Sequence, residues 1–281
     1  MKMAIKRFVA LTVKFFFSAI VHFKIGRFFY EQIVETLINR TKLIEHCDVK
    51  LELSVPNGLT MYRADSFSSK EPETLDWIDG LPKESVLWDI GANVGLYSCY
   101  AAKKLNCRVF AFEPSVFNLE ILARNIHLNE LTDLVTIVPL PLSDELSINR
   151  LNMTSVSWGG AMSTFGQSYG HDGKILNEVF VIPLLGLSMG DAVDSLGIQQ
   201  PDYIKMDVDG IEHLILKGGK SVLEQTKGII IEVNDEFNSQ ARDADLYLHE
   251  AGFELKEKLH AAHFDLLDSQ ERNTYNQIWI K

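Results

Sequence analysis

The strongest structural signal in the sequence is Val86-Leu87-Trp88-Asp89-Ile90-Gly91-Ala92-Asn93-Val94-Gly95-Leu96-Tyr97. Its first part, apolar except for Asp89, is typical of a buried parallel strand. The turn that follows contains Gly91 and Gly95, which allow backbone angles and close approaches that a Cβ would block. A helix is predicted over residues 96–105, with its unpaired N–H groups directed at the turn. A strand, a glycine turn and a helix N-terminus form the usual cradle for a nucleotide-like ligand in a doubly wound sheet.

A second unit supports a ligand at this turn. The segment Arg108-Val109-Phe110-Ala111-Phe112-Glu113-Pro114 predicts another strand that ends in an acid. Glu113 follows the first turn by about 20 residues, where an acid can accept hydrogen bonds from both hydroxyls of a ribose. The two signals together indicate an adenosine-containing cofactor but not which one. The alternative is a strand-to-helix turn that binds no ligand.

Three ordered motifs resemble those of one family. They are Asp-Ile-Gly-Ala-Asn-Val-Gly-Leu-Tyr-Ser at residues 89–98, Ala-Phe-Glu-Pro at 111–114, and Tyr-Ile-Lys-Met-Asp-Val-Asp-Gly-Ile-Glu at 203–212. The sequence is similar here to class I S-adenosylmethionine (SAM)-dependent methyltransferases of the FkbM family. The resemblance covers residues 50–281, although Asp209 stands where the family more often has Glu. It implies an α/β fold with a Rossmann-like, doubly wound, mostly parallel sheet and an antiparallel C-terminal strand.

The resemblance also implies SAM as cofactor and S-adenosylhomocysteine (SAH) as product. Segment 71–78, just before the first strand, is familiar from this family and belongs to an element that often covers the cofactor. A third strand is predicted at residues 134–140. In this fold the turn after that strand, here residues 141–144, borders the adenine. The expected cofactor contacts are therefore Asp89, Gly91, Asn93, Gly95, Glu113, Ser143, Asp144 and Glu71. A solvated helix start at Glu71 and an ordinary Ser-Asp turn at 143–144 remain the alternatives.

Methyl transfer from a sulfonium to a hydroxyl oxygen is an in-line displacement. The protein must position the reactants and remove the hydroxyl proton. Asp207 and Asp209 are the first candidates for this proton transfer, because they follow a predicted strand whose end meets the ligand edge. Lys205 should share the side of Asp207 and can neutralise the acids or hold the substrate. His213 is a further candidate, or else simply a residue of the next helix.

A divalent metal is a second way to acidify the hydroxyl. Asp207, Glu232 and Asn234 offer oxygen ligands of the kind that Mg²⁺ accepts. A metal ion bound by these three residues is therefore an alternative to proton transfer without a metal.

The family resemblance implies O-methylation of a sugar, a glycolipid or a polyketide-like natural product. One rival is an NAD-dependent oxidoreductase, but its fingerprint is Gly-x-Gly-x-x-Gly and Asn93 replaces the middle glycine. The other rival is a non-catalytic, membrane-tethered binding module with the same fold.

Charge separates the first residues from the rest of the chain. The formal net charge is −11, whereas residues 1–30 contain six basic residues and no acid, so the remainder carries −17. An acidic body argues against nucleic acid as a partner. Residues 8–29 are rich in apolar side chains but are interrupted by Lys14, His22 and Lys24, too often to span a bilayer. We expect either a helix that lies on anionic lipid or a helix docked on the body or on a second subunit.

The sequence favours one methyltransferase domain with an addition at its start. We assign residues 1–45 to a basic, apolar helical segment and residues 46–281 to the domain, with 46–80 as hairpin and cover helix and 86–281 as catalytic core. Three cysteines without a C-x-x-C pair fit a reducing cytosol. The expected location is therefore cytoplasmic, or peripheral at the inner face of the membrane, and a homo-oligomer is one way to cover the first helix.

Three local predictions complete the reading. Apolar and polar residues alternate over residues 49–55, and the turn Pro56-Asn57-Gly58 precedes residues 59–63. This pattern predicts a β-hairpin. Residues 152–173 lack a period and predict a lid or binding loop, in which Trp158, Phe165 and Tyr169 can stack on a substrate. A helix over residues 239–251 is expected to be capped by Ser239 and ended by Gly252.

Overall fold

The computed structural model describes residues 2–260 and 273–281. Within this range, the central sheet has seven strands in the order β11-β12-β10-β9-β3-β4-β5. The parallel strands at its centre are β3 (Val86–Ile90), β4 (Arg108–Phe112), β5 (Val135–Val138), β9 (Tyr203–Met206) and β10 (Gly228–Asn234). At one edge β12 (Thr274–Ile280) runs antiparallel to both β10 and β11 (Glu254–Leu259). This order confirms the predicted class I methyltransferase fold. Residues 261–272, between β11 and β12, lie outside the described residues.

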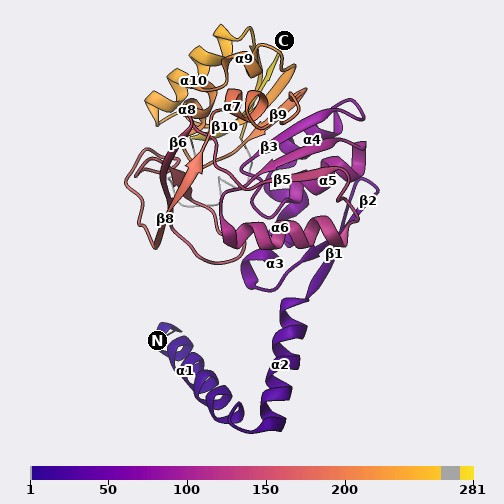
Figure 1. Ribbon diagram of the computed structural model, residues 1–281, viewed down its shortest axis with the longest axis vertical. Helices are drawn as coiled ribbons and strands as arrows, with labels where there is room; N and C mark the ends of the chain where they lie inside the picture. The colour runs from indigo at the N-terminus through magenta and orange to yellow at the C-terminus, as the bar shows by residue number, and fades with distance from the viewer. Residues whose placement is uncertain (1, 261–272) are drawn as a thin grey trace.

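Helices cover both faces of the sheet and give it two cores (Figure 1). Leu87 and Val109 face the core beneath α4 (Pro72–Asp79), α5 (Leu96–Leu105) and α6 (Val116–Leu128). Trp88 and Phe112 face the opposite core. The helices of that side are α7 (Met189–Asp194), α8 (Glu212–Lys217), α9 (Lys220–Leu223) and α10 (Asn238–Glu250). Because successive strand residues face opposite sides, a sheet with helices on both faces requires the nearly continuous apolar strands seen in the sequence.

The β-hairpin lies earlier in the chain than the sequence predicts. It consists of β1 (Thr41–His46) and β2 (Val49–Ser54), joined by a turn at Cys47 and Asp48. Residues 59–63, predicted to be the second strand of the hairpin, instead lie in helix α3 (Gly58–Lys70). The Asn57 side chain accepts a hydrogen bond from the Thr60 N–H and completes a capping box. The prediction was wrong because an Asn-Gly pair supports both a turn and a helix cap.

The predicted lid region contains a second, smaller sheet. Strands β6 (Ser147–Met153), β7 (Ser163–Phe165) and β8 (Phe180–Gly186) pair antiparallel in the order β7-β6-β8. Phe165 is buried in this sheet, whereas Trp158 donates a hydrogen bond to Glu120 and Tyr169 packs edge-on against Phe237. The three aromatic side chains therefore do not form one common surface.

The start of α10 also differs from the prediction. Ser239 lies inside the helix, and Phe237 occupies the N-cap without a side-chain hydrogen bond. The end is as expected, because Gly252 follows the C-cap with a φ of +86°. One polar residue near the beginning of α10, Gln240, instead donates a hydrogen bond to Glu212.

Two helices at the beginning of the chain project away from the body (Figure 1). They are α1 (Lys2–Ile20) and α2 (Lys24–Ile38), and α2 contains no buried residue. Phe15 is 79% exposed and Ile25 is 74% exposed. No helix among the described residues is long and apolar enough to cross a membrane. The structure therefore differs from the expectation that this segment docks on the body of its own chain.

Candidate cofactor and acceptor site

The glycine turn between β3 and α5 brings two strand ends into contact. Gly91 and Gly95 have φ angles of +82° and +78°, and Asn93 has a φ of +52°. A Cβ on Gly91 would lie 1.8 Å from the backbone oxygen of Asp207, at the end of β9. Because no side chain fits there, Gly91 permits the close approach that puts the turn beside Asp207. Gly95 itself is the N-cap of α5 and packs against Leu122.

Glu113 is held under the turn by backbone donors. Its carboxylate accepts hydrogen bonds from the N–H of Asn93 at 2.8 Å and of Ser115 at 2.7 Å. The side chain is only 5% exposed, and this burial raises the pKa of Glu113 to about 7 despite the two donors. The carboxylate is therefore fixed in orientation and still faces a cavity with its remaining lone pairs.

We call this space the apolar cavity. Its walls come from the ends of β3 and β4, from the turn after β5, and from the small sheet. The lining residues include Ile90, Phe112, Glu113, Pro114, Leu140, Leu142, Leu151, Phe165 and Ile211. Asp207 and Asp209 also line this cavity. The apolar walls beside Glu113 suit a planar, mostly apolar ring joined to a hydroxylated sugar.

Ser143 and Asp144 are not part of this cavity. Asp144 forms an ion pair with Lys217 at 2.9 Å, and the Ser143 hydroxyl hydrogen-bonds to Asp144. The hydrogen bond from Lys217 holds the pKa of Asp144 below its usual range, against the effect of partial burial. The structure therefore places both residues beside α8, whereas the sequence-based expectation placed them at an adenine. The preceding residues, Leu140, Pro141 and Leu142, line the cavity instead.

Lys205 connects two of the predicted acids beneath the turn. It pairs opposite Asp89 in the parallel register of β3 and β9, and its ammonium lies 3.3 Å from Asp89 Oδ1 and 3.7 Å from Asp207 Oδ2. Burial alone would lower the pKa of Lys205, but these carboxylates outweigh it and raise the pKa. Asp89 also accepts a hydrogen bond from Ser98. Asp89 therefore lies below the site and lines none of its cavities, whereas Lys205 and Asp207 reach them.

A second space, the Glu71 cavity, lies on the other side of the glycine turn. Glu71 is buried, pairs with Lys70 and accepts a hydrogen bond from the Tyr97 hydroxyl at 3.0 Å. Burial opposes ionisation of Glu71, but Lys70 and Lys205 lower its pKa on balance. This cavity contains both an acid and bases, because Arg63, Lys70, Glu71, Lys205 and Asp207 all line it.

A third space, the Glu232 cavity, is lined by several polar and charged side chains. Glu232 extends into it from β10, and burial together with the nearby Asp207 raises the pKa of Glu232 well above its usual range. Tyr62 and Arg63 enter from α3, and His171 enters from the segment between β7 and β8. His171 was not predicted from the sequence; its Nε2 is buried and makes no hydrogen bond among the described residues. The surrounding segment lacks any period, so no sequence pattern marked this histidine.

Asp209 fastens the small sheet to the site. Its Oδ2 accepts hydrogen bonds from the backbone N–H groups of Met162 at 2.7 Å and Ser163 at 3.1 Å. Asp209 has a φ of +62°, a conformation that Asp adopts more readily than Glu. Burial raises its pKa, and the neighbouring Asp207 adds to that effect. The Asp209 carboxylate therefore holds the backbone of a loop that covers the site.

Glu212 holds the turn that carries Asp207 and Asp209. Its carboxylate accepts hydrogen bonds from the N–H groups of Val208 and Gly210 and from the Gln240 side chain. Burial raises the pKa of Glu212 to about 7. Gln240 in turn accepts a hydrogen bond from the Asn234 N–H, so this network links the ends of β9 and β10. The sequence analysis quoted Glu212 within a motif but did not assign it this role.

Two of the predicted residues point elsewhere. His213 is buried against Phe237, with ring centroids 5.9 Å apart, and lines none of the three cavities. Burial lowers the pKa of His213. Asn234 also lines none of them, because its side-chain oxygen accepts a hydrogen bond from the Glu236 N–H. Among the described residues, no third His, Cys, Asp or Glu joins Asp207 and Glu232 within the 4.8 Å expected of a metal-ligand group.

Three residues belong to all three cavities. Gly91, Asn93 and Asp207 line the apolar cavity, the Glu71 cavity and the Glu232 cavity alike. The cavities are therefore adjoining parts of one site, which meet at the end of β3. Asn93 also ties the turn to the covering loop, because its amide donates to the backbone oxygen of Gly160 at 2.7 Å.

Comparison with known families agrees with this geometry. The model of the methyltransferase FkbM domain matches residues 89–255. The chain belongs to the FkbM methyltransferase family. This match confirms the family predicted from the three sequence motifs.

Individual relatives are more distant. The chain is 27% identical over 154 residues to hexuronic acid methyltransferase AglP of Haloferax volcanii, which spans 54% of this chain and 57% of AglP. It is 26% identical over 178 residues to methyltransferase sdnD of Sordaria araneosa, which spans 55% of this chain and 68% of sdnD. A solved structure of M. jannaschii TYW2 with AdoMet aligns over 85% of this chain and 84% of that protein, with a TM-score of 0.46 and 14% identity.

Proposed function

We propose that this protein is a SAM-dependent O-methyltransferase that acts on a hydroxyl of a sugar, a glycolipid or a polyketide-like natural product. The observation that carries the proposal is the meeting of three adjoining cavities at Gly91, Asn93 and Asp207. One cavity suits an adenosine, one suits an amino-acid zwitterion, and the third is polar enough for an acceptor. Membership of the FkbM family supports the same activity.

The residues present fit SAM. Glu113 keeps lone pairs free to accept hydrogen bonds from ribose hydroxyls, and the apolar walls suit the adenine. In the Glu71 cavity, Glu71 matches an ammonium group, while Lys70 matches a carboxylate. When bound, SAM supplies an electrophilic methyl group on its sulfonium.

We assign the proton transfer to Asp207. Asp207 lines all three cavities, so it lies where a methyl donor bound in one cavity would meet an acceptor bound in another. Lys205 fixes one side of the carboxylate, and 30% of the Asp207 side chain remains exposed to receive a hydroxyl proton. Asp209 receives a positioning role instead, because its Oδ2 is bonded to two backbone N–H groups.

The Glu232 cavity favours a polyhydroxylated acceptor. Burial and the nearby Asp207 raise the pKa of Glu232, which favours its protonated form as a hydrogen-bond donor, while His171 Nε2 has no hydrogen-bond partner among the described residues. Arg63 adds a guanidinium, which suits a carboxylate or a phosphate on the acceptor. Because AglP is a hexuronic acid methyltransferase by name, hexuronic acids and their glycosides are the first acceptors to try.

The test is transfer of a labelled methyl group from SAM to a panel of sugars, hexuronic acids, glycolipids and polyketides. We expect an alkali-stable methyl ether on one acceptor class, and binding of SAH but not of NAD⁺ by calorimetry. Binding of NAD⁺ alone would contradict the proposal in favour of an oxidoreductase. SAH binding without transfer to any class would instead favour a non-catalytic module.

A metal ion is the alternative means of acidifying the hydroxyl. Asp207 and Glu232 both line the Glu232 cavity, but Asn234, the third predicted ligand, does not. Dialysis against EDTA, followed by addition of Mg²⁺, distinguishes the two mechanisms. Turnover that is lost and then restored by Mg²⁺ would support the metal, and unchanged turnover would exclude it.

We further propose that α1 and α2 place the enzyme on an anionic membrane surface, at the inner, cytoplasmic face. Residues 1–30 carry six basic residues and no acid, and their aromatic side chains are largely exposed, including Phe8, Phe15 and Phe23. Basic residues interleaved with exposed aromatic ones suit an interfacial helix. A lipid-linked acceptor would then be presented at the same surface.

Co-sedimentation with anionic and neutral vesicles tests this placement. We expect binding to anionic vesicles only, and loss of binding in a Phe15→Ser, Phe16→Ser variant. Ile148→Ser is the matched control, because Ile148 is 77% exposed on β6, away from these helices. Equal behaviour of both variants, or concentration-dependent self-association through residues 1–30, would contradict membrane docking in favour of a second copy.

A further inference from the structure

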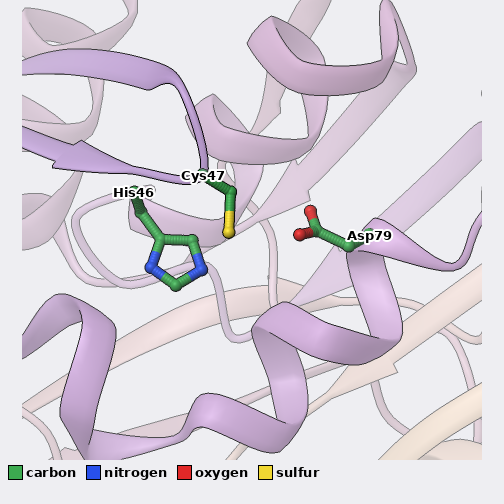
Figure 2. Close-up of side chains that lie close together, drawn as sticks. All are labelled: His46, Cys47 and Asp79. Atoms are coloured by element: carbon green, nitrogen blue, oxygen red, sulfur yellow. The ribbon is translucent and has the colours of Figure 1, made fainter.

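A second cluster of potential ligands lies away from the three cavities. His46 ends β1, Cys47 lies in the turn after it, and Asp79 ends α4 (Figure 2). One ligand atom from each residue lies within 4.8 Å of the other two. Zinc bonds to sulfur, nitrogen and oxygen are about 2.0–2.3 Å long, so ligand atoms around one zinc are about 3–4 Å apart. Small side-chain movements therefore suffice to bring the three atoms around one ion.

The side chains are already oriented by their neighbours. His46 Nδ1 lies 3.0 Å from the Ser68 hydroxyl, and Figure 2 shows the other ring nitrogen on the side of Cys47 and Asp79. With the proton on Nδ1, the Nε2 lone pair is available to a metal. The Tyr100 hydroxyl donates to Asp79 Oδ1 at 2.7 Å, which leaves Oδ2 unoccupied by that donor. Metal-ligating histidines and carboxylates in proteins are oriented by hydrogen bonds of this kind.

The thiol is accessible and its backbone is constrained. Cys47 is exposed and has a φ of +44°, and its backbone oxygen accepts a hydrogen bond from Lys104. A non-glycine residue in the left-handed region costs free energy, which surrounding contacts must offset. Exposure provides an entry path for an ion, and the left-handed turn fixes the direction of the Cys47 Cα–Cβ bond.

We infer that His46, Cys47 and Asp79 bind a zinc ion, with a water molecule as fourth ligand. A thiolate with an imidazole selects zinc over Mg²⁺, and one carboxylate completes a common type of donor set. None of the three residues lines the cavities of the methyl-transfer site. The ion would join the β1–β2 hairpin, which follows α2 directly, to the end of the helix that precedes β3. Its role is therefore to fasten the base of the projecting helices to the catalytic domain.

Alkylation of Cys47 tests the site without any activity assay. Cys99 and Cys107 are fully buried, so labelling of the folded, chelator-treated protein reports on Cys47. We expect one zinc per chain and alkylation slowed at least about tenfold by zinc, since a metal-bound thiolate is less available to the reagent. A cobalt-substituted sample should show a thiolate-to-cobalt absorption band that is absent in Cys47→Ser.

Two variants separate ligation from a purely structural role. Asp79→Asn keeps an acceptor for Tyr100 but removes the charge, and it should weaken zinc binding at least about tenfold. Asp48→Asn is the matched control, because it alters an acid in the same turn whose side chain is outside the cluster, and it should bind zinc like the wild type. Zinc should also raise the melting temperature of the wild type but not of Cys47→Ser. Absence of zinc binding, or equal zinc protection in Asp79→Asn and wild type, would overturn the inference.

Discussion

The ligand edge carries two carboxylates, the buried Glu113 and the half-buried Glu232, which differ in their hydrogen bonding. Glu113, after β4, accepts hydrogen bonds from two backbone N–H groups. Glu232, in β10, has no hydrogen-bond partner in the part of the chain that the structure describes, and it borders other acids. Burial raises the pKa of both. The half of the ligand edge around Glu113, the cofactor half, is therefore ordered before a ligand binds. The half around Glu232, the acceptor half, leaves polar groups without hydrogen-bond partners until a ligand binds.

The largest effect is expected for a substitution of Asp207, where the two halves meet. Asp207→Asn should reduce kcat by about 10²–10⁴-fold, because the amide cannot accept the hydroxyl proton. The affinity for SAH should change only a few-fold, since Glu113 and Glu71 remain. Turnover and calorimetry on the same preparations measure both quantities. A loss of SAH affinity as large as the loss of kcat would show that Asp207 belongs to the cofactor half.

Glu113→Gln should affect the cofactor half alone. Hydrogen bonds to a charged group contribute about 1.5–3 kcal/mol, so the dissociation constant for SAH should rise about 10–100-fold. The exposed Glu145→Gln, on the surface of the same domain, is the matched control and should bind SAH normally. Unaltered SAH affinity in Glu113→Gln would contradict the ribose assignment.

The raised pKa of Glu113 predicts how cofactor affinity depends on pH. Ribose hydroxyls donate to the ionised carboxylate, and this form is lost as the pH falls through the pKa of about 7. SAH should therefore bind about tenfold more weakly at pH 6 than at pH 8, with proton release on binding near pH 7. Calorimetry in buffers of different ionisation enthalpy measures this release. The same slope in Glu113→Gln would assign it to another group.

The smallest effect is expected where a loop bridges the two halves. Asp209→Asn preserves an acceptor and tolerates the positive φ, but it weakens the hydrogen bonds to Met162 and Ser163 by loss of charge. KM for the acceptor should rise by about fivefold, with kcat within about threefold, as expected for a loss of about 1 kcal/mol in loop positioning. A fall in kcat comparable to that of Asp207→Asn would instead make Asp209 the base.

The same contrast explains what the sequence could predict. The bounds of β3 and α5 follow from the sequence because the strand is continuously apolar and the turn needs glycines. The acids at the strand ends follow from the same pattern. Pro56-Asn57-Gly58 was misread because a turn and a helix cap use the same residues, and only long-range packing decides between them.

Residues that act across long distances in the chain escaped prediction. His171 reaches the Glu232 cavity from an aperiodic segment, and Gln240 donates a hydrogen bond to Glu212 from α10, 28 residues later in the chain. Asp144 was expected at the adenine, but the proximity of Lys217, 73 residues later, decides its position. Local patterns specify elements and strand ends, whereas the direction of a side chain at a strand end depends on partners that only the fold brings near.

A crystal structure with SAH tests the central claim most directly. The account predicts that the ribose hydroxyls bond to Glu113, that the adenine occupies the apolar cavity, and that the sulfur faces the Glu232 cavity beside Asp207. SAH bound outside these cavities, or a ribose with no contact to Glu113, would contradict it.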